Sequence, residues 1–212
     1  MLNQLGLKNC FVNACAKPIV LSRMTEQELL QDCLRRLNQS TIDYMLVGSM
    51  ASNFWGIPRS THDIDFVVQY EAKDVDAIVK LFQDDFFIQE ISVRSGLKPP
   101  YQFNALDNRS ALKVDFFRLA GDAYEMQRFE RRRAVNILGQ PAFLAAPEDV
   151  ILHKLRWYMI SPSDRQLSDS AGIMAVSIDI IDDRYLDYWA NEIGVTDLLE
   201  KLRTGQMPPK AT

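Results

Sequence analysis

The spacing of hydrophobic residues along the chain changes from helical to extended and back, and this spacing predicts most of the elements. A first helix is predicted over residues 26–39, because apolar side chains recur there every three or four positions. Thr25 and Glu28 stand in the pattern of a capping box at its start, in which each side chain bonds the backbone N–H of the other residue. Cys33 falls within the apolar stripe, so we expect it to be a core thiol.

Shorter apolar runs predict the strands. They lie at 43–48, 63–69, 86–93, 101–106, 111–117, 134–138 and 141–145. Helices are predicted between them, at 50–55, 73–84 and 121–130. Asp107–Ser110 has the composition of a hairpin turn. Pro147 suits the first turn of a helix, and the pattern from there to Leu202 is helical, in about four pieces. We therefore expect an α/β domain at 25–145 and an α-helical region at 147–204.

Composition narrows the class of protein. The chain has 212 residues, of which 47% are hydrophobic and 25% charged, as in an ordinary globular protein. No apolar run approaches the ~20 residues of a membrane-spanning helix, so we expect no membrane partner. Residues 1–24 lack a charged leader before a continuous hydrophobic core, and we expect a loosely packed extension rather than a secretory signal. A functional chain that begins near Met24 is the alternative.

The cysteines and the net charge bear on compartment and partners. Cys10, Cys15 and Cys33 are an odd number without metal-site spacing, which predicts free thiols and a cytoplasmic protein. A net charge of −4 predicts no general attraction to nucleic acid. Any such contact would need a local patch, for which Arg128 and the run 131–133 are the candidates. A solvated basic face is the alternative reading of these arginines.

Two short motifs point to chemistry. Gly48-Ser49 ends an apolar run, and Asp63-Ile-Asp65 opens another, with Asp63 fourteen residues after Ser49. Successive strand side chains alternate, so the two aspartates share one face, about 7 Å apart along the strand. Glycine allows a phosphate close to the backbone, and the N–H groups of a helix start attract it. Because Mg²⁺ is held by one or two carboxylates plus substrate phosphates, the pattern predicts a site for Mg²⁺ and a nucleotide.

Asp115 is a candidate third acid. It stands inside an apolar strand, where it is either a solvent-facing residue or a neighbour of the Asp63/Asp65 pair in the same sheet. Three clustered carboxylates raise at least one pKa unless a cation joins them, which gives Mg²⁺ an electrostatic role. Asp115 would then be a metal ligand and a base for the attacking hydroxyl. An isolated Asp-x-Asp is more often a turn cap and a solvent-facing residue, and the preceding Gly-Ser favours the metal-ligand interpretation.

Together these motifs resemble the polymerase-β-type nucleotidyltransferase superfamily, whose signature is a hydrophobic-Gly-Ser turn, an Asp-x-Asp pair and a later carboxylate. Pro58–Thr61 and Pro147–Leu155 make the chain most similar to the AbiEii/MenT-related nucleotidyltransferases, several of which are toxins of toxin–antitoxin pairs. The resemblance spans about residues 40–200. It implies a mixed sheet with flanking helices, Mg²⁺ as cofactor and a nucleoside triphosphate as substrate.

The resemblance also implies residues from the helical region. Lys154 and Asp169 best match a lysine and an aspartate that reach the nucleotide in such proteins, although Ser168 replaces the usual basic residue before Asp169. Lys154 is otherwise a surface lysine. Arg59 is either a phosphate-binding residue or a solvated loop residue. The histidines, His62 and His153, have no metal-site spacing and are taken as ordinary side chains.

Two functions follow from these observations. The first is a nucleotidyltransferase that transfers a nucleoside monophosphate to an acceptor hydroxyl on RNA, on protein or on a small molecule, with a cognate antitoxin as a further partner. The second is a non-catalytic protein of the same fold that senses nucleotides or binds a partner. Non-catalytic relatives usually lose an acid, and all three candidates are present here, which favours the enzyme.

Overall fold

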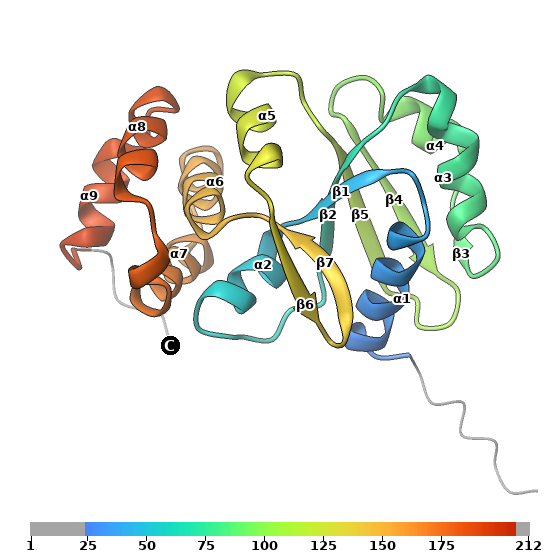
Figure 1. Cartoon of the computed structure of the whole chain (residues 1–212), viewed down its shortest axis with the longest axis horizontal. Helices are drawn as coiled ribbons and strands as arrows, with labels where there is room; N and C mark the ends of the chain where they lie inside the picture. The colour runs from blue at the N-terminus through green and yellow to red at the C-terminus, as the bar shows by residue number, and fades with distance from the viewer. Residues whose placement is uncertain (1–23, 207–212) are drawn as a thin grey trace, which may run out of the picture.

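One mixed sheet of seven strands forms the centre of the computed structural model, which describes residues 24–206 (Figure 1). In sheet order the strands are β3 (Phe86–Phe87), β4 (Gln102–Asp107), β5 (Lys113–Arg118), β2 (Ile64–Gln69), β1 (Asp43–Leu46), β7 (Gln140–Leu144) and β6 (Arg133–Ile137). The β2–β5 and β1–β7 pairs are parallel, and the others are antiparallel. This sheet with its flanking helices confirms the predicted fold class.

Helices cover the sheet and extend beyond one side of it, as Figure 1 shows. The first group packs near β3, β4 and β7: α1 (Glu26–Asn38), α3 (Val75–Phe82) and α4 (Glu90–Ser95). The second group lies on the other side: α2 (Gly48–Trp55), α5 (Ala123–Glu130), α6 (Pro147–Ile160), α7 (Asp164–Val176), α8 (Asp183–Glu192) and α9 (Thr196–Arg203). Within the described residues no helix is long and apolar enough to cross a membrane.

The start of the chain agrees with its pattern where it is described. The capping box of Thr25 and Glu28 is present, and Cys33 is fully buried in the core. Burial raises the pKa of the Cys33 thiol far above its usual value, as expected of an unreactive core thiol. The expectations for Cys10 and Cys15 fall outside the described residues.

The strand predicted at 86–93 is wrong. Only two residues pair with β4, and the chain then forms the short helix α4. Within α4 Val93 is buried, whereas Ile91 is 72% exposed, so this part of the run has one side chain to bury and not the alternating set of a strand. The Tyr70 hydroxyl donates a hydrogen bond of 2.8 Å to the carbonyl of Val93, which holds α4 against the sheet.

Aromatic stacking sets the register of the central strands. Phe66 of β2 and Phe116 of β5 stack at 5.7 Å between ring centroids, and Phe103 of β4 stacks on Phe116 at 5.0 Å. Since strand side chains alternate, these rings fill one face of the sheet and the residues between them fall on the other. A slip of one residue in this pairing would exchange the two faces, so the rings also determine which side chains point away from the core.

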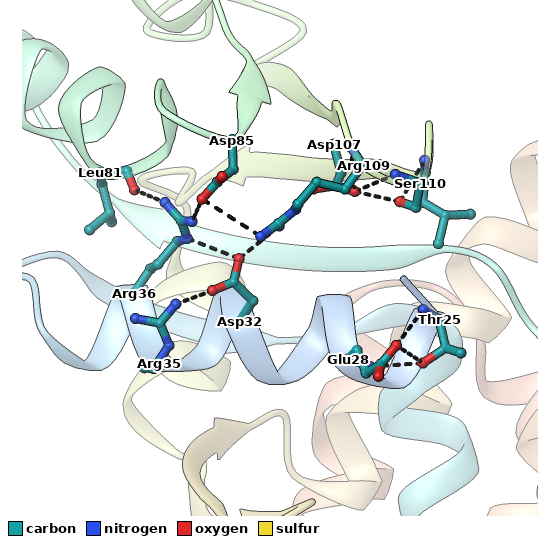
Figure 2. Close-up of polar contacts among 11 residues, drawn as sticks. Thr25, Glu28, Asp32, Arg35, Arg36, Leu81, Asp85, Asp107, Arg109 and Ser110 are labelled. Carbon is teal, nitrogen blue, oxygen red and sulfur yellow. Dashed lines mark hydrogen bonds and ion pairs between the residues drawn. The ribbon is translucent and has the colours of Figure 1, made fainter. Parts of the chain in front are cut away.

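A polar cluster fastens α1 to the edge strands (Figure 2). The buried Asp32 of α1 accepts hydrogen bonds from Arg36 at 3.1 Å and from Arg109 of the β4–β5 turn at 2.8 Å. Arg109 also bonds Asp107, which is fully buried, and Arg36 pairs with Asp85. Every charge in this cluster has a partner of opposite sign, so we assign it a structural role. The hairpin turn predicted at 107–110 is confirmed.

Candidate functional site

The Gly48-Ser49 turn joins β1 to α2 and is held very close to β2. Gly48 has a φ of +63°, and a Cβ built on it would lie 2.1 Å from Oδ2 of Asp65. Glycine is therefore required for both its left-handed backbone and its lack of a side chain. The next residue, Ser49, accepts a hydrogen bond of 2.9 Å from Arg59 through its hydroxyl. The turn thus places backbone N–H groups and a hydroxyl beside a carboxylate.

The sheet brings the candidate acids together. Asp63 is exposed just before β2, and Asp65 lies within the strand, partly buried. Asp115 on the parallel strand β5 stands directly opposite Asp65 in the register. Residues 63, 65 and 115 occupy the face opposite Phe66 and Phe116, because side chains alternate along each strand. Of the two placements that the sequence left open for Asp115, the structure has the one beside Asp65, while the chemical roles of the three acids stay a prediction.

The electrostatics show an excess of negative charge at this point of the sheet. Burial, followed by the charges of Asp115 and Asp63, raises the pKa of Asp65 to about 6. Lys113 offsets part of this charge, since its ammonium lies 2.7 Å from Oδ2 of Asp115. The hydrogen bond to Asp115 is also the main reason that the pKa of Lys113 is raised. The other oxygen of Asp115, Oδ1, is buried and has no hydrogen-bond partner.

These residues fit Mg²⁺ in chemistry, although they are not preassembled around an ion. Over residues 24–206 no group of three or more histidine, cysteine, aspartate or glutamate side chains stands in a metal-binding arrangement. Mg²⁺ does not need three, because it is usually held by one or two carboxylates and by substrate phosphates. The unpartnered oxygen of Asp115 and the raised pKa of Asp65 are features of clustered carboxylates that a cation would stabilise.

Basic side chains from the α2–β2 loop and from α6 approach the Gly-Ser turn from the other side. Arg59 binds both oxygens of Asp169 at 2.8 Å, as well as Ser49. Lys154 of α6 lies 2.8 Å from Oδ2 of the same Asp169, and it donates to Gln166 at 3.3 Å. Although burial opposes it, hydrogen bonds from Arg59 and Lys154 lower the pKa of Asp169. Arg59 is therefore a fixed residue of the site rather than a solvated loop residue.

A cavity of about 410 Å³ lies between the sheet and the helices. Gly48, Ser49, Asp63, Asp65 and Lys154 line it, so it connects the acidic and basic groups. Arg59 and Asp169 do not line it and instead bind lining residues. This volume is in the range of small-molecule sites.

The same cavity includes residues that the sequence did not assign to the nucleotide site. They come from α5 and α6: Glu125, Arg128, Val150, His153 and Trp157. His153, taken from the sequence as an ordinary side chain, has a buried Nδ1 without a hydrogen-bond partner. A signal was available in the spacing, because 150, 153, 154 and 157 fall on one face of a helix and include the predicted Lys154.

The arginine run does not form a solvated basic face. Arg128 is buried and bonds Glu125 at 2.8 Å. Arg131 lies 3.2 Å from the buried Glu148, with its guanidinium 3.5 Å from the centre of the Tyr185 ring. Arg132 pairs with an aspartate of β1 at 3.2 Å. These partners neutralise most of the patch that the sequence offered for nucleic-acid binding.

Comparisons with known proteins locate the fold. No protein-family model matches the chain, and no curated protein matches it in sequence. A nucleotidyltransferase-like antigenic protein from Paracoccidioides brasiliensis shares 17% identity at a TM-score of 0.52, over 84% of this chain and 92% of that one. The antibiotic-resistance factor ANT(2'')-Ia shares 12% at 0.55, over 87% and 100%. The lincosamide antibiotic adenylyltransferase LnuA, solved with lincomycin, shares 12% at 0.50, over 73% and 99%. The chain therefore has the nucleotidyltransferase fold, and no comparison singles out the AbiEii/MenT-related group.

Proposed function

We propose that this protein is a Mg²⁺-dependent nucleotidyltransferase. It would transfer a nucleoside monophosphate from a nucleoside triphosphate to a hydroxyl of an acceptor, with release of pyrophosphate. The observation that carries the proposal is the meeting of two opposite charge groups at one cavity. The sheet contributes the carboxylates of Asp63 and Asp65, and the helices contribute Lys154 and the Gly48-Ser49 turn. A metal-bound triphosphate carries both complementary charges.

The phosphates are assigned to the Gly48-Ser49 turn. Its N–H groups open α2, and a helix N-terminus favours an anion. Lys154 adds a compact positive charge from α6. Asp169 acts through other residues, because it holds Lys154 and Arg59 in place without lining the cavity itself.

The acids are assigned to the cation and to the acceptor. Asp63, Asp65 and Asp115 would hold Mg²⁺, which neutralises charge on the phosphate during transfer. Asp115 is also assigned as the base, since its Oδ1 has no hydrogen-bond partner; this buried oxygen, whose residue does not line the cavity, would have to become accessible to take the proton of the acceptor hydroxyl. The hydroxyl oxygen then forms a bond to the α-phosphorus, and the bond from that phosphorus to the leaving pyrophosphate breaks. Since Oδ1 would take the proton, the cation would need Oδ2, and the ion pair of Lys113 with that oxygen must break.

Finer parts of the proposal rest on the motifs alone. The similarity of Pro58–Thr61 and Pro147–Leu155 to the AbiEii/MenT-related group supports a cytoplasmic enzyme that modifies RNA or protein, with an antitoxin as partner. The nucleotidyltransferases among the structural neighbours include antibiotic adenylyltransferases, which supports a small-molecule acceptor instead. Identifying the product of the neighbouring gene would show whether an antitoxin is encoded beside this protein.

A nucleotide sensor without turnover is the second candidate. One observation favours it: Lys113 already neutralises Asp115, as a protein that no longer needs a cation would arrange. In the enzyme the ion pair between Lys113 and Asp115 would break when nucleotide binds, whereas in the sensor it would persist. Only the enzyme would transfer a nucleotide, so transfer experiments distinguish the two candidates.

The test is transfer of a labelled nucleotide. Purified protein is incubated with Mg²⁺, a cell extract and a mixture of nucleoside triphosphates labelled on the α-phosphate, and in parallel with the γ-labelled forms. We expect α-label, and no γ-label, to pass to an acceptor. Asp63→Ala should lower transfer by at least about 100-fold, because several kcal/mol of charge stabilisation is lost. Asp84→Ala, at an exposed carboxylate after α3, is the control.

Each outcome has a distinct reading. Transfer that persists in Asp63→Ala would remove the assigned role of that residue. Passage of the γ-label would replace nucleotidyl transfer with phosphoryl transfer. Binding of nucleotide without any transfer, across several extracts, would favour the sensor.

A further inference from the structure

The protonation of His153 leaves a hydrogen-bond donor without a partner. Trp157, one turn further along α6, lies with its Nε1 2.7 Å from Nε2 of His153. An indole N–H can only donate, so Nε2 of His153 must accept. Burial, with the charges of Arg128, Arg156 and Lys154, lowers the pKa of His153 well below its usual value, so the ring is neutral. A neutral ring with an accepting Nε2 carries its proton on Nδ1, which is buried without a partner.

Glu125 supplies an acceptor on the same cavity. The Nε and terminal nitrogen of Arg128 both bind Oε2 of Glu125, each at 2.8 Å. Among the described residues no group donates a hydrogen bond to the other oxygen, Oε1. The charges of Arg128 and Glu125 balance each other, while Oε1 of Glu125 can still accept a hydrogen bond. This suits recognition of an uncharged polar group rather than of a second ion.

The aromatic ring beside them is open to the cavity. Trp157 lines the cavity and is 42% exposed, so part of its indole is open to contact with a ligand. It lies on the same face of α6 as Lys154, three residues apart. A ligand whose phosphates are held by Lys154 therefore reaches Trp157 and His153 with the part next to the phosphates. In a nucleotide that part is the nucleoside.

We propose that Trp157, His153 and Glu125 form the subsite for the nucleobase of the triphosphate. The base stacks on Trp157, Nδ1–H of His153 donates to a ring nitrogen, and Oε1 of Glu125 accepts from an exocyclic amino group. An amino group beside a ring-nitrogen acceptor is the Watson–Crick edge of adenine and cytosine, whereas guanine and uracil present a ring N–H there. The subsite is therefore assigned to an amino base, adenine or cytosine. This inference rests on the proposed function, because it assumes phosphates at Lys154.

The experiment compares nucleotides with a ligand that has phosphates and no base. Isothermal titration with Mg²⁺ measures the affinity of ATP, CTP, GTP, UTP and inorganic tripolyphosphate. The variants are Trp157→Ala, Trp157→Phe and His153→Ala, and Tyr188→Ala removes an exposed aromatic on α8 outside the cavity as the control. Thermal unfolding followed by circular dichroism verifies that each variant is folded.

We expect the wild-type protein to bind ATP or CTP at least several-fold more tightly than GTP and UTP. Trp157→Ala should weaken the preferred nucleotide about tenfold or more, the usual effect of losing a base–aromatic stack. Tripolyphosphate should bind Trp157→Ala and the wild type equally. Trp157→Phe keeps a ring for stacking and should retain most of the affinity. His153→Ala should reduce the difference in affinity between the amino-base nucleotides, ATP and CTP, and the other two, GTP and UTP.

Three results would overturn the inference. Unchanged nucleotide affinity in Trp157→Ala would mean that the base lies elsewhere, and that this end of the cavity receives the acceptor. Equal weakening of nucleotide and tripolyphosphate would place Trp157 at the phosphates. Failure of the wild-type protein to bind either ligand would refute the proposed function and this subsite with it, whereas the first two results leave the proposed function standing.

Discussion

Replacing Asp65 with asparagine is expected to stabilise the metal-free protein while it abolishes transfer. Burial, then the charges of Asp115 and Asp63, raises the pKa of Asp65 from 3.8 to about 6. One pKa unit corresponds to about 1.4 kcal/mol, so ionising this carboxyl costs the folded state about 3 kcal/mol. Asparagine keeps the shape beside Gly48 and cannot ionise. We expect a gain of about 1 to 3 kcal/mol in the free energy of unfolding at pH 8.

The pH dependence of this gain follows from the sign of the shift. The folded pKa lies above the unfolded one, so the cost is absent below the unfolded value, grows as the pH rises and is complete above the folded value near 6. The difference between variant and wild type should therefore be largest at pH 8 and fall to about a third at pH 4.5. Urea unfolding in EDTA at the two pH values measures it, and Asp84→Asn is the control for loss of an exposed carboxylate.

Mg²⁺ and nucleotide should reverse the order of stability. The wild-type protein is expected to gain stability when they bind, and Asp65→Asn is not. An Asp65→Asn protein that is equal to or less stable than the wild type at pH 8 in EDTA would refute the reasoning. It would mean that the carboxylate of Asp65 is stabilised by groups other than a bound cation.

The remaining predictions concern the residues around the acids. Lys113→Met should tighten Mn²⁺ binding to the nucleotide-free protein about three- to tenfold, measured by electron paramagnetic resonance, because the competing ammonium is gone. Gly48→Ala should lower the free energy of unfolding by more than about 1 kcal/mol in urea, since its φ is +63° and its Cβ would meet Asp65. Asp169→Asn should lower the free energy of unfolding, measured in urea, by about 3 kcal/mol, because the buried Lys154 loses its charged partner. For the same reason it should raise the KM for nucleotide.

Matched variants make these predictions refutable. Lys113→Arg keeps the charge and should bind Mn²⁺ as the wild type does, so an equal gain in both variants would contradict competition by the ammonium. Gly48→Ala should lower the free energy of unfolding by less when Asp65 is also replaced by alanine. An equal loss in both backgrounds would exclude a clash between the new Cβ and the Asp65 side chain. An unchanged KM in Asp169→Asn would mean that Asp169 does not position Lys154 for binding the phosphates.

The acids on β2 were predictable because their chemistry and their geometry are local. Asp63 and Asp65 alternate at the start of an apolar run, and strand geometry alone puts them on one face. Their position opposite Asp115 was not predictable in this way. It depends on which strands are neighbours and in what register, and here the stack of Phe66 on Phe116 determines the register.

The residues from the helical region show where sequence reasoning reached its limit. Lys154 and Asp169 were predicted from a family resemblance, and nothing in their spacing indicates that one carboxylate would bind both Lys154 and Arg59. The pairing of Lys113 with Asp115 was likewise missed, although residues two apart on a strand face the same side. His153 and Trp157 were missed because their proposed roles depend on a hydrogen bond between them and on the cavity that α6 lines.

The distribution of charge at the cavity says what kind of ligand can bind it. Excess negative charge lies on the sheet, where one oxygen of Asp115 has no partner and the pKa of Asp65 is raised. On the helical side, Arg59 and Lys154 share the single carboxylate of Asp169, which leaves one positive charge in excess. A simple anion would meet repulsion at the acids, and a simple cation would meet it at Lys154. A cation carried by a polyphosphate satisfies both sides at once, which is why we propose a metal-bound nucleotide, and not the metal or the phosphate alone, as the ligand of this cavity.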